Sequence, residues 1–304
     1  MANYTIGDMI YETRIARGYS QEELSFGICS TSSLSRIENN QQVPGKRLFD
    51  ALMQRLGVSE SIFSSFISRE DMELYRLTQQ LEWSVERSDN QKISEIIVEL
   101  ESKIRDKHMF EQQYVLYAKA HILSMQGGRR KEVIELLMDA IHITMPDFVP
   151  ENGTKRRLLT FLEITILSFL ATELYDDEEQ IISLKLMLEL KEYMEKHIID
   201  EEEKAKKYPM IIYNITKQIG NQGMHEEVYR LCDSAIDFCV EHNKLIALPY
   251  LLTNMACAAA EIHKLEEAKD LFLQAITLYT ICKKESYAKH LRKNVPVDYG
   301  IELD

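Results

Sequence analysis

The sequence has little glycine and little proline, with 11 Gly and 6 Pro among 304 residues. Folds made of strands need turn residues at short intervals, so this scarcity argues against a β protein. Long stretches rich in Leu, Ile, Glu and Lys favour helices instead. The sequence therefore predicts an all-α protein that is long enough for two or more domains.

Cysteine is also scarce, and the five cysteines are dispersed: Cys29, Cys232, Cys239, Cys257 and Cys282. An odd, scattered set is typical of reduced thiols in a cytoplasm. No early stretch has a basic start followed by an apolar segment, and no apolar run reaches about 18 residues. We therefore expect a cytoplasmic protein without a membrane span.

Catalytic motifs are absent from the sequence. The string His225-Glu226-Glu227-Val228-Tyr229 begins like a zinc-protease helix, but Tyr229 stands where the second imidazole is needed. Neither a GxxxxGK[ST] phosphate loop nor a GxSxG elbow occurs, and Cys-x-x-Cys is absent. We therefore expect a protein that is not an enzyme and has neither a cofactor nor a metal site.

The net charge of −13 is unevenly distributed. Residues 1–69 hold seven Lys or Arg and seven Asp or Glu, whereas residues 70–304 hold 29 basic and 42 acidic groups. Attraction to phosphate depends on local charge, so the first segment can bind a polyanion although the whole chain is acidic. The acidic remainder is expected to face away from any nucleic acid.

Residues 6–58 have a specific order of predicted helices. Ile6 and Ile10 share one face of a first helix, and Gly18 ends it. Ser20 and Glu23 have the spacing of a capping box, which predicts the start of a second helix.

The third predicted helix begins after Ser30, which can cap it, and runs to about Glu38. Leu34 and Ile37 are spaced i, i+3 and are expected to pack inward. Four residues lie on or near the opposite face: Thr31, Ser32, Ser35 and Arg36. Short hydroxyl side chains allow a helix to enter the major groove, and one long cation can reach a base or a phosphate.

Several further residues are candidates for phosphate contacts. Gln21 at the start of the second helix can act together with the free N–H groups there. Four cations in the same segment are additional candidates: Arg14, Arg17, Lys46 and Arg47. A fourth helix, framed by Pro44 and Gly57, is expected to close the small core.

The string SQEELSFGICSTSSLSRIE resembles the XRE-type helix-turn-helix of bacterial and phage repressors, over about residues 5–65. The resemblance implies DNA contacts from the following residues: Gln21, Thr31, Ser32, Ser33, Ser35 and Arg36. This sequence departs from that family in its third helix, where four of the first five residues are Ser or Thr and none is Gln or Asn.

The rest of the chain contains internal repeats. Asn214–Ile236 aligns with Asn254–Ile276 at an offset of 40, and residues 128–141 match residues 223–236 at an offset of 95. Each unit is expected to be two helices joined by a short turn. Five pairs and a terminal helix are expected, near 70–105, 108–143, 156–200, 208–243, 247–282 and 285–294. The units resemble tetratricopeptide repeats, which stack into a solenoid with a concave binding surface.

The concave surface is where we expect a ligand. Asn214 and Asn254 hold the same place in their repeats, and an inward amide can bind the backbone of an extended peptide. Met210, Tyr250 and Lys217 lie one turn away and would set side-chain preference. The alternative is that a repeated Asn only satisfies a hydrogen bond between packed helices.

An XRE-type domain fused to such repeats resembles the RRNPP family of quorum-sensing receptors, and within it the PlcR-like transcriptional regulators. The supporting strings are YNITKQI, NMACAAAEIHKLEEA and SYAKHL. The resemblance implies a short signalling peptide in the repeat groove, homodimers formed by the repeats, and two DNA-binding heads. It also implies peptide contacts from Tyr213 with Asn214, from the amide of Asn254 and from the aromatic ring of Tyr287.

The sequence therefore predicts three parts: a DNA-binding domain at 1–65, a linker region at 66–90 and a repeat domain at 91–304. The leading hypothesis is a transcriptional regulator controlled by a peptide. The alternative is a repeat protein that docks a protein partner, as response-regulator antagonists do, with a vestigial DNA head.

Overall fold

The structure, a computed structural model, describes residues 5–59, 69–87, 89–105, 108–175 and 179–303. These residues form helices and no strand, which confirms the predicted all-α fold. None of the described helices is long and apolar enough to cross a membrane. Residues 66–68 and 88 of the predicted linker region lie outside the described residues.

The internal packing divides the chain into two compact units. Unit 1 comprises Met1–Leu186 with His197–Asp200, and unit 2 comprises Met187–Lys196 with Glu201–Asp304. The boundaries of these units differ from the three-part division expected from the sequence. That division stays a prediction.

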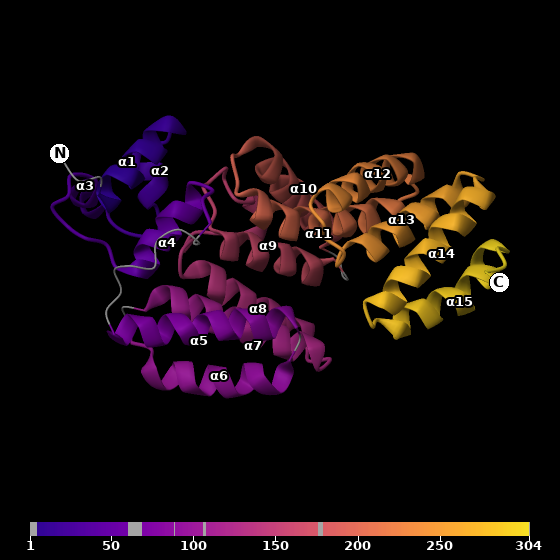
Figure 1. Ribbon diagram of the computed structural model, residues 1–304, viewed down its shortest axis with the longest axis horizontal. Coiled ribbons are helices and arrows are strands. Elements are labelled where there is room, and N and C mark those ends of the chain that lie inside the picture. The colour runs from indigo at the N-terminus through magenta and orange to yellow at the C-terminus, as the bar shows by residue number, and fades with distance from the viewer. Residues whose placement is uncertain (1–4, 60–68, 88, 106–107, 176–178, 304) are drawn as a thin grey trace. The chain divides into compact units, whose positions relative to one another are not determined.

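Unit 1 begins with four short helices, shown in indigo and violet in Figure 1: α1 Ile6–Ala16, α2 Gln21–Ser25, α3 Thr31–Glu38 and α4 Lys46–Arg55. Both predicted caps are confirmed, because Ser20 and Glu23 form a capping box and the Ser30 hydroxyl accepts a hydrogen bond from Ser33 N–H. Leu34 and Ile37 are fully buried in the core of this domain. The apolar spacing and the local caps therefore build the predicted helix-turn-helix.

The remaining helices of unit 1 form consecutive pairs: α5 Arg69–Glu86, α6 Asn90–Lys103, α7 Met109–Met125, α8 Arg130–His142 and α9 Phe161–Leu174. The next helix, α10 Gln180–Lys196, is divided between the two units. Helix α5 packs on α6, α6 on α7, α7 on α8 and α8 on α9, and α5 also packs on α7. A first helix that packs on the first helix of the next pair is typical of a tetratricopeptide-like stack.

Unit 2 continues with five helices: α11 Glu201–Gly220, α12 His225–Glu241, α13 Leu248–Glu261, α14 Leu265–Ile281 and α15 Glu285–Tyr299. Successive helices are adjacent, and α11 also packs on α13. The small residues of the repeat serve this packing, since Ala235 and Ala275 are about 1 % and 0 % exposed. The predicted pairs and the terminal helix are all present, and α15 extends to Tyr299.

Within unit 1 the helix-turn-helix domain packs directly on the repeats. Arg55 of α4 and Glu163 of α9 form an ion pair at 3.1 Å, with side chains 1 % and 0 % exposed. Gly27 has a φ of +66°, and a Cβ there would collide with the carbonyl oxygen of Thr144. Leu158, which precedes α9, belongs to the hydrophobic core of the helix-turn-helix domain. A charged pair this deeply buried is stable only while both partners stay together, so it ties the two parts of the unit to each other.

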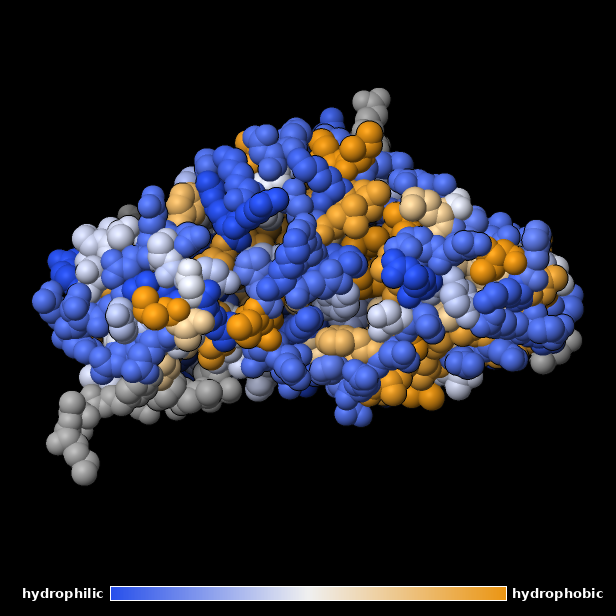
Figure 2. Space-filling view, turned by 90° about the horizontal axis from the view of Figure 1, so that it is seen from above, coloured by the Kyte–Doolittle hydropathy of each residue, from blue (hydrophilic) through white to orange (hydrophobic). Residues whose placement is uncertain are grey.

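Hydrophilic and hydrophobic side chains both occur on the surface of the protein. The space-filling view shows mostly hydrophilic side chains at the end that holds α1 to α3, with small hydrophobic patches between them (Figure 2). Tyr11, Ile15 and Val43 are the large exposed apolar side chains of that domain. Scattered apolar residues of this kind are normal on a soluble surface and need no partner.

Candidate functional site

Helix α3 presents a polar face to the surface of the domain. Thr31, Ser32 and Arg36 are exposed, while Ser33 and Ser35 are half-buried. Within the described part of the chain, the side chain of Arg36 has no hydrogen bond or ion pair. Its guanidinium is the one long cationic group on this face, and its donors are available for a ligand.

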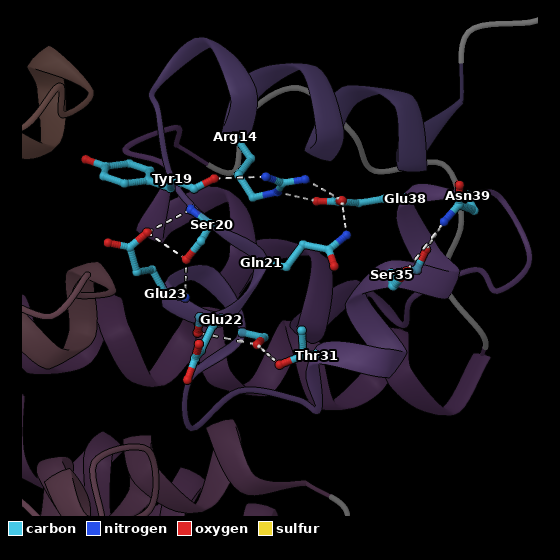
Figure 3. A network of polar contacts seen from close by, with 11 residues as sticks. Arg14, Tyr19, Ser20, Gln21, Glu22, Glu23, Thr31, Ser35, Glu38 and Asn39 are labelled. Carbon is cyan, nitrogen blue, oxygen red and sulfur yellow. Dashed lines mark hydrogen bonds and ion pairs between the residues drawn. The ribbon is translucent and has the colours of Figure 1, made fainter.

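The opposite side of α3 holds a buried polar network that also involves α1 and α2 (Figure 3). Glu38 accepts two hydrogen bonds from Arg14, each of 2.7 Å, and a third of 2.6 Å from the amide of Gln21. Arg14 also donates to the carbonyl oxygen of Tyr19 at 2.8 Å. The hydrogen bond to Glu38 raises the pKa of Arg14, and burial opposes that shift. Arg14, only 6 % exposed, therefore joins α1 to α3 and to the turn before α2, and its guanidinium does not face outward.

Lys46 and Arg47 at the start of α4 are directed toward the repeats of unit 1. The ammonium of Lys46 is buried in an ion pair with Asp50 and lies 5.1 Å from the ring centroid of Tyr75. The Arg47 guanidinium lies 5.0 Å from the same centroid, and its Nε is 3.1 Å from Oε1 of Glu111. The predicted DNA-binding residues therefore fall into an outward group on α3, an inward group of three cations, and Gln21, which is half-buried on α2 and bonded to Glu38.

The sequence reasoning missed Asn39, which follows α3. It is exposed, and its amide donates to the carbonyl oxygen of Ser35 at 2.8 Å. The signal was its position four residues after Ser35, which places an amide on the same side as the serine. An amide is a common partner of adenine, so Asn39 supplies a side chain of the type that the start of α3 lacks.

Unit 2 brings three predicted tyrosines together with a fourth. The ring centroid of Tyr250 lies 5.2 Å from that of Tyr213, 5.3 Å from Tyr279 and 5.4 Å from Tyr287. Tyr279 and Tyr287 are stacked at 5.2 Å. These four residues come from α11, α13, α14 and α15 and are called the tyrosine cluster below. Such tilted, edge-on and stacked pairs are favourable, so the cluster is a preformed aromatic surface.

Two lysines flank the tyrosine cluster. The ammonium of Lys284 donates to the hydroxyl of Tyr250 at 2.6 Å and lies 4.6 Å from its ring centroid. Burial and the neighbouring Tyr250 raise the pKa of Tyr287, whereas Lys284 and Lys217 lower it. Burial, together with the nearby Tyr287 and Tyr250, raises the pKa of Tyr213 to about 12. The predicted Lys217 therefore lies in the same electrostatic neighbourhood as the cluster.

The two repeated asparagines have different surroundings. Asn254 donates to Thr216 Oγ1 at 2.9 Å and to the carbonyl oxygen of Tyr213 at 3.2 Å, which joins α13 to α11. This is the packing hydrogen bond that the sequence left open as an alternative. The half-buried Asn214 has no side-chain hydrogen bond within the described residues. Asn214 therefore keeps both its donor and its acceptor for a ligand.

The remaining predicted residue, Met210, is half-buried on α11, one turn before Asn214. Tyr279, at 2 % exposed, is the most buried member of the tyrosine cluster. Lys284 was missed, although it directly precedes the helix that carries Tyr287. Cys232 and Cys239 are buried, and burial raises their pKa values to about 12 and about 11. Among the described side chains, no group of three or more potential metal ligands occurs.

Comparison with known proteins agrees with this organisation. Residues 10–63 match the family described as Helix-turn-helix. A search of curated proteins by sequence finds no match. The first part of the chain is therefore a helix-turn-helix domain, and the rest of the chain carries tetratricopeptide-like repeats.

Solved structures with a similar fold cover nearly the whole chain. One is Bacillus thuringiensis PlcR in complex with the peptide PapR7 and DNA, with 17 % sequence identity and a TM-score of 0.59. The match covers 96 % of this chain and 100 % of that chain. Another is the apo form of the competence regulator ComR from Streptococcus vestibularis, with 13 % identity, a TM-score of 0.53, and 97 % and 98 % of the two chains covered. The fold expected from the resemblance to PlcR-like proteins is confirmed.

Proposed function

We propose that this chain is a transcriptional regulator that binds duplex DNA through α3 and is controlled by a short signalling peptide. The observation that carries the proposal is the exposed face of α3, where Thr31, Ser32 and Arg36 reach the surface while the inward side is fixed by Arg14 and Glu38. A rigid helix with a free polar face is what readout in the major groove requires. PlcR, which shares the fold, was crystallised with DNA and a peptide.

The proposed DNA-binding face consists of the outward residues of α3 and its flanks. Thr31, Ser32 and Arg36 would reach base edges, with Ser33 and Ser35 behind them. Gln21 donates one amide N–H to Glu38 and would donate the other N–H to a phosphate, whose oxygens only accept. Arg14, Lys46 and Arg47 are left out of this face, because each is engaged inside unit 1. Their charges stabilise the domain rather than a complex.

The proposed peptide site is the tyrosine cluster with its neighbours on α11 and α13. An extended peptide would place its backbone amides against Asn214 and against the free oxygen of Asn254. Apolar side chains of the peptide would rest on Tyr213, Tyr250 and Tyr287, beside Met210. Lys217 would attract a carboxylate of the peptide. Aromatic surfaces with a few fixed polar groups are typical of peptide grooves.

Control by the peptide would act through a change in the curvature of the repeats. We propose homodimers formed by the repeat domain, so that two DNA heads are held at a defined spacing. A peptide that binds more tightly to repeats of one curvature shifts the population toward that conformation, and this changes the spacing of the two DNA heads. The proposed division is 1–65 for DNA binding, 66–90 for the linker region, and 91–304 for peptide binding and dimerisation.

A binding experiment with the full-length protein tests the proposal. Labelled genomic fragments from the source organism are titrated with protein in a gel-shift assay, with and without a synthetic peptide. The peptide is taken from a short secreted reading frame beside the gene. We expect retention of specific fragments and a change in their affinity when peptide is added. Failure to bind any fragment would favour the alternative, a repeat protein that docks a protein partner.

A further inference from the structure

The connection between α8 and α9, residues 143–160, carries three consecutive cations in an otherwise acidic part of the chain: Lys155, Arg156 and Arg157. None of them belongs to the helix-turn-helix domain. This connection is called the basic loop below, and it lies entirely in unit 1.

The basic loop packs on the turn that leads into α3. The guanidinium carbon of Arg157 lies 4.0 Å from the ring centroid of Phe26, the residue that ends α2. The next residue, Gly27, approaches the backbone of Thr144 so closely that no side chain fits between them. The loop and the turn between α2 and α3 are therefore in direct contact.

Two of the three cations have local partners. Asp147 accepts a hydrogen bond of 2.6 Å from Arg157 and one of 3.1 Å from Lys155. These bonds, that of Arg157 first, lower the pKa of Asp147. The carboxylate therefore stays charged and holds both cations in place. Arg157 uses its other face to cover Phe26, so it serves as the anchor of the loop.

Arg156, which lies between Lys155 and Arg157, differs from both in its surroundings. It is exposed, and within the part of the chain that the structure describes it has neither a hydrogen bond nor an ion pair. Its φ is +57° and that of Lys155 is +52°, so two adjacent residues with side chains adopt the left-handed conformation. This conformation is unfavourable for such residues and persists only when the surroundings impose it. Here the paired Lys155 and Arg157 impose it, and the result is an outward cation.

We propose that Arg156 binds a backbone phosphate of the same duplex that α3 enters. The inference rests on the proposed DNA binding and adds a contact from the repeat part of the chain. Thr31 follows Gly27 by four positions, so the turn beneath the loop lies within ~15 Å of the start of α3. The major groove is about 12 Å wide, so a long side chain on an element within this distance of α3 can reach a phosphate that flanks the groove. An anchored, unpaired guanidinium has the geometry for such a phosphate.

The contact has a consequence for regulation. Residues 1–69, which contain the helix-turn-helix domain, have no net charge, so each added phosphate contact matters for DNA affinity. Because Arg156 belongs to the repeats, a rearrangement of the repeats that moved the basic loop would change DNA affinity directly. The phosphate contact would carry no sequence information, and specificity would stay with α3.

The test measures how DNA affinity depends on salt, using full-length protein and a fluorescently labelled duplex of mixed sequence. Each lost phosphate contact reduces the slope of log K against log salt by about 0.9. We expect Arg156→Ala to reduce the slope by this amount and to lower affinity about three- to tenfold at low salt. Arg156→Lys should retain the slope. Arg129→Ala is the matched control, because it removes an exposed arginine at the far end of α8.

A second variant separates binding from folding. Arg156→Gly removes the side chain and relieves the left-handed strain, so the Tm should not fall while the salt slope falls as in Arg156→Ala. If Arg156 only stabilised the fold, its removal would instead lower the Tm. If wild type binds the duplex and both variants keep its slope, this inference is overturned and the proposed function stands. If wild type binds no duplex at all, the proposed function fails and takes the inference with it.

Discussion

The carboxylate of Glu38 holds the guanidinium of Arg14 through two hydrogen bonds of 2.7 Å inside the helix-turn-helix domain. The two residues are 24 positions apart, and they join the end of α3 to α1. The exposed face of α3 depends on this pair, because the pair sets the rotation of the helix about its own axis.

The first prediction concerns that pair. Glu38→Ala leaves a buried guanidinium without its counter-charge, so the free energy of unfolding should fall by about 3–5 kcal/mol. Urea denaturation followed by circular dichroism measures the change. Arg36→Ala serves as the control, since removal of an exposed side chain should alter stability by less than about 0.5 kcal/mol. A Glu38→Ala protein as stable as wild type would show that the pair does not support the domain.

The second prediction concerns the free cation of α3. Arg36→Ala should lower affinity for a specific genomic fragment by about 1–3 kcal/mol, because the donors on Arg36 would pair with a base or a phosphate. Affinity for the peptide should be unchanged. The comparison is with Arg292→Ala, which removes an exposed arginine from α15. Equal losses of DNA and peptide affinity would contradict two separate sites.

The third prediction separates the two repeated asparagines. Asn214→Ala should weaken peptide binding by about 1–3 kcal/mol in calorimetry, since a peptide amide would lose its partner. Its stability should equal that of wild type, because the side chain has no hydrogen bond among the described residues. Asn254→Ala should reduce stability as well, by about 1 kcal/mol, because it removes the bonds to Thr216 and Tyr213. The reverse pattern of stabilities would refute this assignment.

The fourth prediction follows from the titration of the tyrosine cluster. Burial raises the pKa of Tyr213 from 10.0 to about 12, so the folded state holds this proton more tightly than the unfolded chain does. Its contribution to stability is therefore complete below pH 10 and is lost as the pH rises from about 10 to about 12. During an alkaline titration, tyrosinate absorbance should show a fraction of tyrosines that ionise only at high pH. Tyr213→Phe should make this fraction smaller. An unchanged titration curve in that variant would contradict the buried environment.

Local features of the sequence were sufficient for most of the fold. The caps at Ser20 and Ser30 act on N–H groups only three residues away, so their pattern is readable without tertiary structure. The buried pair Leu34 and Ile37 follows from helix periodicity in the same way. The repeated Ala residues marked where helices pack, because small side chains are needed at close approach.

The candidate sites were less predictable, because a charged residue looks the same in the sequence whether it is free or paired. Lys46 and Arg47 appear as surface cations until the structure places Asp50, Tyr75 and Glu111 beside them. The pairing of Asn254 with Tyr213 spans 41 positions, which no local pattern reports.

The sequence by itself determined the helices, their caps, their repeat and the presence of a helix-turn-helix, because these depend on interactions within one or two turns. Only the tertiary structure decided which polar groups are left over for a ligand. The side chain of Arg14 is hydrogen-bonded to Glu38, whereas that of Arg36 has no partner among the described residues. The side chain of Asn254 is hydrogen-bonded to α11, whereas that of Asn214 has no partner among the described residues. The physical reason is that a side chain's availability depends on every neighbour within hydrogen-bond reach, and those neighbours come from distant parts of the chain.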